Sequence, residues 1–258
     1  MNAILDFATI LRDFQKAKRP FQLIYNLVSL SKQQRLLVLD ASFNPPHLGH
    51  IHLVKSAVNY YSNSDVHVLL LLSINNADKV TQPASFDKRL GMMCIAADIL
   101  QRDNVHTSVA ITMFGKFVEK SLAIQNEMCF EGTTVYLVGF DTLVRIFDPK
   151  YYLPLPISEV LSQFMTKSEL YCLTRGSKDN EKYQLNYVKD ISKGTYEPNI
   201  PRVWASKIHI ELNTEEHSQI SSSDIRRLLY TQDVSSMMPK EILKYINQTS
   251  PNNNIFGR

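Results

Sequence analysis

The sequence predicts an α/β fold built around a doubly wound parallel sheet. Apolar runs of strand length alternate along the chain with stretches of helical periodicity, and the runs are apolar almost without interruption, as in residues 68–72. Such runs are typical of strands buried on both faces, and their alternation with helices indicates parallel βαβ units. In sheets of this kind, ligands bind beyond the carboxyl ends of the strands.

The individual elements follow from the same pattern. We expect strands at residues 35–39, 66–72, 105–109, 134–138, 170–174 and 207–212. We expect helices at residues 47–60, 86–101, 117–125, 141–146, 158–164, 223–229 and 241–248. Near the N-terminus, Ile4, Leu5, Ala8 and Leu11 recur at helical spacing, which predicts an amphipathic helix packed on the main domain.

A single domain is expected to span residues 1–258, because this length suits one or two domains and no interdomain linker is evident. Residues 1–34 are expected to form a helical N-terminal extension. Residues 177–202 are polar and show no clear period, so we expect a surface insertion there. The polar run near the C-terminus predicts a flexible tail over residues 250–258.

Charge and cysteine content exclude several function classes. The chain has 28 Lys and Arg against 25 Asp and Glu, a net charge of +3, which does not indicate a nucleic-acid partner. The three cysteines, at positions 94, 129 and 172, lack close spacing, which argues against a disulfide framework or a structural zinc site. The longest apolar runs are only strand-sized, so no membrane partner is expected.

The N-terminal segment lacks the features of a targeting signal. It carries Asp6 and Asp13 and has no basic stretch followed by an apolar one, which a secretory signal requires. A mitochondrial presequence would be rich in Arg and poor in acidic residues. We therefore expect a cytoplasmic protein, and the basic cluster at residues 16–19 leaves a nuclear location open as well.

A phosphate site is predicted where the strand at residues 35–39 ends. The chain continues there through a loop with two prolines into a helix that starts near His47. The N–H groups and the dipole at a helix N-terminus favour an anion such as phosphate. His47 and His50 are three residues apart, so both imidazoles can lie on one helix face near that anion. Gly49 leaves room for a base or ribose to approach the backbone.

A second anion site is predicted near the C-terminus. Ser221 precedes Asp224 by three residues, as in a capping box at the start of a helix. Serine hydroxyls, helix N–H groups and Arg226 or Arg227 can converge there on an anion. Taken alone, the segment is better explained as a capped amphipathic helix with exposed arginines.

The two motifs together resemble a known family. The signature of the nucleotidylyltransferase superfamily, in the form used by nicotinamide mononucleotide adenylyltransferases, is similar to Ser42-Phe43-Asn44-Pro45-Pro46-His47-Leu48-Gly49-His50. The signature Ile-Ser-Ser-Thr-x-Ile-Arg, with which the family binds ATP phosphates, resembles Ile220-Ser221-Ser222-Ser223-Asp224-Ile225-Arg226. Ala41 stands where the first pattern usually has Gly, and Ser223 stands where the second has Thr. The resemblance implies a Rossmann-like nucleotidylyltransferase fold and a divergent, fungal-type member of the family.

Weaker matches lie between these motifs, in family order. Lys79 follows the second expected strand, where the family has a lysine near the phosphates. Arg89 begins a segment that resembles the family's Arg-x-x-Met helix. Gly139 and Asp141 match a strand-end Gly-x-Asp that holds nucleotide ribose and base. Arg175 matches a further strand-end Arg-x-Gly.

One family feature is missing from the sequence. The family stacks nicotinamide on a tryptophan after the third strand, and residues 106–115 contain none. Phe114 or Phe117 offers an aromatic face in its place. The only tryptophan, Trp204, borders the expected surface insertion.

The resemblance implies a role for each matched residue. It implies catalysis by His47, His50 and Arg226. It implies ATP binding by Ser42, Phe43, His47, Gly49, His50, Lys79, Ile220, Ser221, Ser222, Ser223 and Arg226. It implies mononucleotide binding by Asn44, Lys79, Arg89, Gly139, Asp141, Arg175 and Phe114. Mg²⁺ would enter on the substrate phosphates and keep most of its waters, without a carboxylate cage.

The implied reaction joins ATP and nicotinamide mononucleotide to give NAD and pyrophosphate, as a step of NAD biosynthesis. Two alternatives stay open. In one, the adenylyl group passes to nicotinic acid mononucleotide or to another acceptor. In the other, the chain is an ATP-binding or ATP-hydrolysing scaffold, or a chaperone-like protein, on the same fold. Protein partners and oligomeric state do not follow from the sequence.

Overall fold

A seven-stranded sheet forms the centre of the computed structural model, which describes residues 6–26, 30, 35–75, 84–176, 178–249 and 255–256. The strand order is β1-β4-β3-β2-β5-β6-β7, and neighbouring strands are parallel except for β1, which runs antiparallel to β4. The strands are β1 (Phe21–Tyr25), β2 (Arg35–Asp40), β3 (Val66–Ser73), β4 (Thr107–Thr112), β5 (Thr133–Gly139), β6 (Ser168–Leu173) and β7 (Ile208–Glu211).

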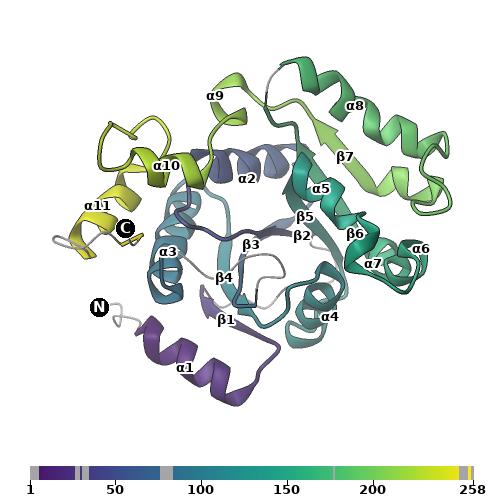
Figure 1. Ribbon diagram of the computed structural model, residues 1–258. Helices are drawn as coiled ribbons and strands as arrows, with labels where there is room; N and C mark the ends of the chain where they lie inside the picture. The colour runs from purple at the N-terminus through teal and green to yellow at the C-terminus, as the bar shows by residue number, and fades with distance from the viewer. Residues whose placement is uncertain are drawn as a thin grey trace.

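Helices cover both faces of this sheet, as Figure 1 shows. They are α1 (Phe7–Ala17), α2 (Leu48–Tyr60), α3 (Phe86–Arg102), α4 (Phe117–Glu127), α5 (Phe140–Ile146), α6 (Ile157–Val160), α7 (Ser162–Lys167), α8 (Lys178–Ser192), α9 (Glu215–Ser218), α10 (Ser222–Leu228) and α11 (Lys240–Thr249). Two short 3-10 helices are η1 (Pro149–Tyr151) and η2 (Arg202–Lys207). The predicted doubly wound α/β fold is confirmed.

Two hydrophobic cores lie on opposite faces of the sheet, because successive side chains of a strand point to opposite sides. Leu37 and Leu39 of β2 enter one core, together with side chains from α1, α2, α3, α10 and α11. Leu36 and Val38 enter the other, together with side chains from α4, α5, α7 and α8. Burial on both faces explains why the central strands are apolar at nearly every position.

The chain changes its direction of travel across the sheet at β2. From β2 it moves outward through β3 to β4, and it then returns to place β5, β6 and β7 on the other side of β2. A crevice forms beyond the carboxyl ends of the strands where the order reverses in this way, and such crevices bind ligands. The loop after β2 and the start of α5 after β5 both open into this region.

The N-terminal extension differs from the expectation, because it contains a strand as well as a helix. Helix α1 buries Leu11 and Phe14, and β1 then joins the sheet edge beside β4. The register of β1 shifts between Leu23 and Tyr25, so its buried residues do not alternate. A five-residue strand without alternation has no local signal, since long-range pairing with β4 is what stabilises it.

The segment 177–202, expected as a surface insertion without periodicity, instead contains helix α8. Its side chains Gln184, Tyr187 and Ile191 are buried, and the last two belong to the second core. Helix α8 is therefore the crossover that connects the parallel strands β6 and β7. The many charged residues of this helix lower its mean hydropathy, so the spacing of its apolar residues was not recognised as helical in the sequence.

Two smaller expectations also change. The helix expected at residues 158–164 is two short helices, α6 and α7, which meet at Leu161. Within the expected flexible tail, Phe256 is buried in the first core, while residues 250–254 and 257–258 lie outside the described residues. Among the described helices, none combines the length and apolar character needed to span a bilayer.

Candidate active site

A pocket of about 370 Å³ lies beyond the carboxyl ends of the central strands. The end of β2, the loop after it and the start of α2 contribute Asp40, Ala41, Ser42, Asn44, His47 and His50 to its wall. The segment leading into α10, and α10 itself, contribute Ser221, Ser222, Ser223 and Arg226. The start of α4 and the segment before it contribute Gly115, Lys116, Phe117 and Lys120. The remaining lining residues are Ser73, Arg89, Thr142, Arg145, Ile146, Tyr151, Tyr152 and Arg175.

The loop after β2 sets His47 at the start of α2. His47 is the residue before the first helical position and has an extended backbone, so the helix begins immediately after it. Its backbone N–H donates to Nδ1 of His50 at 3.1 Å, and the two rings lie 3.7 Å apart between centroids. Because Nδ1 of His50 accepts a hydrogen bond, the proton of the neutral ring is assigned to Nε2.

Burial keeps both imidazoles neutral. It lowers the pKa of His50 to about 4, with the positive charge of Arg175 as a second cause. Burial, followed by His50 and Arg175, holds the pKa of His47 well below its ordinary value. Nδ1 of His47 has no hydrogen-bond partner among the described residues. A buried polar atom without a partner in a pocket wall indicates that a ligand completes it.

Gly49 lies against the His47 ring. A Cβ at this position would lie 3.0 Å from Nδ1 and 3.1 Å from Cε1 of His47. The missing side chain therefore makes room for the His47 imidazole, and Gly49 is not one of the pocket-lining residues. Phe43 is likewise outside the lining: its side chain is buried, and its φ of 46° turns the chain inside the loop.

The segment at α10 contacts the loop after β2 directly. Nη1 of Arg226 donates to the carbonyl oxygen of Asn44 at 2.6 Å, across 182 residues of sequence. The hydroxyl of Ser222 donates to the carbonyl oxygen of Pro45 at 2.9 Å. Ser221 caps the helix by accepting from the backbone N–H of Asp224 at 3.1 Å. The two sequence motifs thus form one wall of one pocket.

Several arginines give the pocket a positive character. Arg89 is buried, and its Nε donates to the carbonyl oxygen of Ala84 at 2.8 Å. Its Nη2 has no partner among the described residues. Burial, followed by the charge of Arg226, lowers the pKa of Arg89 to about 10, so it remains charged at neutral pH. Neighbouring guanidinium groups of this kind favour a multiply charged anion between them.

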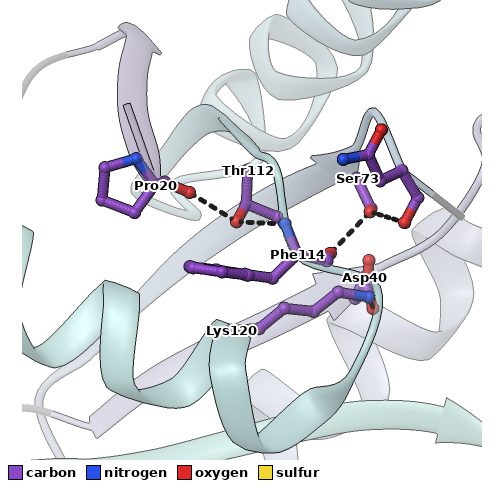
Figure 2. A network of polar contacts seen from close by, with 7 residues as sticks. Pro20, Asp40, Ser73, Thr112, Phe114 and Lys120 are labelled. Atoms are coloured by element: carbon purple, nitrogen blue, oxygen red, sulfur yellow. Dashed lines mark hydrogen bonds and ion pairs between the residues drawn. The ribbon is translucent and has the colours of Figure 1, made fainter. Parts of the chain in front are cut away.

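The α4 side of the pocket carries aromatic rings and a buried ion pair. Phe117, Tyr151 and Tyr152 line it. Figure 2 shows Lys120 of α4 reaching Asp40 at the end of β2, where the two side chains form an ion pair. They are only 5% and 10% exposed.

Phe114, expected as a stacking face, does not line the pocket. Its carbonyl oxygen accepts from the hydroxyl of Ser73 at 2.6 Å, as Figure 2 shows, and its ring packs on the second core. Trp204 does not line the pocket either, because it is buried against Phe147 at 6.0 Å between ring centroids. The phenyl and phenol rings that do line the pocket are those of Phe117, Tyr151 and Tyr152.

Most of the predicted site residues come together in the pocket. Those that line it are Ser42, Asn44, His47, His50, Arg89, Arg175, Ser221, Ser222, Ser223 and Arg226. Those described elsewhere are Phe43, Gly49, Phe114, Gly139, Asp141 and Ile220. Asp141 is exposed and lies 3.8 Å from Arg175. Lys79 lies outside the described residues. Which of these residues bind which substrate stays a prediction.

Sequence reasoning missed one group of lining residues. They are Asp40, Lys116, Lys120, Thr142, Arg145, Tyr151 and Tyr152. The sequence contained a signal for Asp40, because a carboxylate directly after an apolar run is unusual in a buried sheet. The sequence contained no such signal for Lys120, because this lysine occupies an ordinary position within an amphipathic helix.

Comparison with known proteins agrees with this geometry. A family model described as cytidylyltransferase-like matches residues 38–228, a range that includes every residue lining the pocket. The chain belongs to the cytidylyltransferase-like family. A family member of this kind is a nucleotidyltransferase.

This nucleotidyltransferase is similar to a fungal protein in sequence and to two solved structures in fold. A protein of Schizosaccharomyces pombe, provisionally named a nicotinamide mononucleotide adenylyltransferase, is 34% identical over 97% of this chain and 98% of its own. A Plasmodium falciparum nicotinic acid mononucleotide adenylyltransferase complexed with NaAD has a TM-score of 0.58 at 14% identity, covering 84% of this chain and 96% of its own. The same enzyme complexed with APC gives a TM-score of 0.54. At this identity the structural likeness concerns the fold.

Proposed function

We propose that this nucleotidyltransferase joins ATP and nicotinamide mononucleotide to form NAD and pyrophosphate. The observation that carries the proposal is the contact between the His47–His50 loop and the Ser221–Arg226 segment in a basic pocket at the reversal point of the sheet. Neutral histidines, hydroxyls and guanidinium groups in one wall suit a polyphosphate and a reaction that concentrates charge on a phosphate. The name of the 34% identical relative supports the acceptor.

The reaction is an in-line displacement. A 5′-phosphate oxygen of the mononucleotide attacks the α-phosphorus of ATP, and the bond from that phosphorus to the bridging oxygen breaks to release pyrophosphate. Both reactants are anions, so alignment and neutralisation of charge supply most of the catalysis. Nε2–H of His50 donates to an oxygen of the reacting phosphate, and Arg226 stabilises the charge on the departing pyrophosphate.

The metal is proposed to enter with the substrate. Among the described residues, no group of three His, Cys, Asp or Glu side chains is arranged to hold an ion, and the one carboxylate in the pocket lining, Asp40, is paired with Lys120. Mg²⁺ held by phosphate oxygens and water suits such a wall, since Mg²⁺ usually keeps several waters. It would reduce the charge repulsion between the two substrates.

The proposal is tested by incubating purified protein with MgATP and nicotinamide mononucleotide and measuring NAD and pyrophosphate. We expect His50→Ala to lower kcat by about tenfold to a thousandfold, since it removes a donor to the transition-state charge. The matched control is His52→Ala, because His52 stacks on His217 at 4.3 Å outside the pocket lining. Full turnover by His50→Ala would contradict the role. ATP hydrolysis without any dinucleotide would favour the scaffold alternative.

A further inference from the structure

The ion pair between Lys120 and Asp40 needs an explanation other than stability. Both side chains are at least nine-tenths buried and both line the pocket. Removing two charges from water is costly, and a buried pair often stabilises a protein no more than apolar residues of the same size do. An apolar pair would close this part of the wall as well. The charges are therefore better explained by a ligand that they contact.

The pair lies beside an aromatic face of the pocket wall. Lys120 comes from α4, which packs on the face of the sheet opposite to α2 and α10, and it meets Asp40 at the end of β2, directly before the loop that leads to His47. Its Nζ lies 5.1 Å from the centre of the Phe117 ring, one of the aromatic faces in the lining. Figure 2 shows this ammonium directed at the Asp40 carboxylate.

We propose that the Lys120–Asp40 pair selects a carboxamide over a carboxylate on the pyridine ring of the acceptor, an inference that rests on the proposed function. A carboxamide has an acceptor oxygen and a donor NH₂ group. The ammonium of Lys120 has donors left for that oxygen, and the second oxygen of Asp40 accepts from the NH₂. A carboxylate has no donor for Asp40 and is repelled by it, so that the attraction to Lys120 is offset.

The two single variants are expected to act in opposite directions. The measured quantity is the ratio of kcat/KM for nicotinamide mononucleotide to kcat/KM for nicotinic acid mononucleotide. Asp40→Asn removes the repulsion and leaves Lys120 to attract the acid, so the ratio should fall by about tenfold or more. Lys120→Gln leaves a carboxylate facing the acid, so the ratio should rise by at least about threefold.

A double variant covers the case in which a single unpaired charge prevents folding. Asp40→Leu/Lys120→Met leaves no buried charge, and such replacements are tolerated in other proteins. It removes both hydrogen bonds to the amide, whereas the acid loses one attraction and one repulsion. The ratio should therefore fall by about tenfold, mainly through the amide substrate. Lys55→Met is the matched control, because Lys55 pairs with Asp103 at 2.6 Å on the surface.

The outcomes separate this inference from the proposed function. A purely structural pair would change kcat/KM for both acceptors equally, so unchanged ratios in all three variants would overturn the inference while leaving dinucleotide synthesis in place. A wild-type protein that prefers the acid would overturn it too. If wild type forms no dinucleotide, binding of the two mononucleotides is compared by calorimetry. Equal affinities, or binding of neither, would then overturn the inference as well as the proposed function.

Discussion

The immediate surroundings of the pocket histidines determine their protonation. His50 titrates near pH 4 in the folded protein because burial and Arg175 both disfavour the imidazolium. The neutral ring can accept at Nδ1 from the backbone of His47 and still donate at Nε2. A charged ring would lose the first of these interactions, so the low pKa preserves the orientation of the ring.

This shift predicts how stability depends on pH. The ordinary pKa of the imidazole is 6.5 and the folded value is about 4, so the unfolded chain binds the extra proton first as pH falls. The free energy of unfolding should therefore decrease between about pH 6.5 and pH 4. His50→Gln should lose about 1 to 3 kcal/mol less over this range than wild type. Urea denaturation at pH 7 and pH 4.5 measures the difference, and equal losses would contradict the assigned pKa.

The contact between α3 and α11 shows how elements of the first core fit together. Gly91 of α3 faces Tyr245 of α11, and a Cβ at Gly91 would lie 2.3 Å from the tyrosine hydroxyl and 2.7 Å from its Cζ. Such distances require the ring or the helix to move. The glycine is therefore explained by the close approach of α11, which brings Ile242 and Ile246 into the core.

The effect of Gly91→Ala on the free energy of unfolding should change sign when Tyr245 is replaced. Gly91→Ala gains about 0.5 to 1 kcal/mol of helix stability but must displace Tyr245, and overpacking typically costs about 1 to 3 kcal/mol. We expect Gly91→Ala to destabilise the wild-type protein and to stabilise the Tyr245→Ala variant. A double-mutant cycle of urea midpoints measures both effects. If Gly91→Ala has the same sign in both backgrounds, the contact does not limit the packing of α11.

The pocket joins segments that lie far apart along the chain, from Asp40 to Arg226. Arg226 and Ser222 bind carbonyl oxygens in the loop after β2, and Arg175 comes from the strand end between them in sequence. A ligand that contacts these groups binds only the folded chain. Its binding must therefore raise the stability of the entire domain.

MgATP should raise the melting temperature through the Arg226 contact. At about one hundred times Kd, binding adds about 2.7 kcal/mol, which corresponds to roughly 5 to 10 °C for a chain of this size. Arg226→Gln should reduce this shift to less than about half. Arg227→Gln is the matched control, since Arg227 pairs with Asp224 at 2.8 Å and does not line the pocket. Equal shifts in the two variants would remove Arg226 from the nucleotide site.

Local chemistry was enough to predict most of the sheet and several of the residues that line the pocket. The apolar runs identified six of the strands because burial on both faces leaves a continuous signal. His47, His50, Ser222 and Arg226 could be found because each lies within a short motif at a strand or helix end. The crevice where a parallel sheet reverses its strand order is where ligands bind in such folds.

The remaining features depend on contacts between segments that are distant in sequence. Strand β1 exists through its pairing with β4, and helix α8 buries Tyr187 and Ile191 only because β6 and β7 are adjacent. Lys120 reaches Asp40 across 80 residues, which no local pattern of a helix encodes. Burial and partners decide what such residues do. Both arise only when the whole chain has packed, so the tertiary structure was needed to locate them.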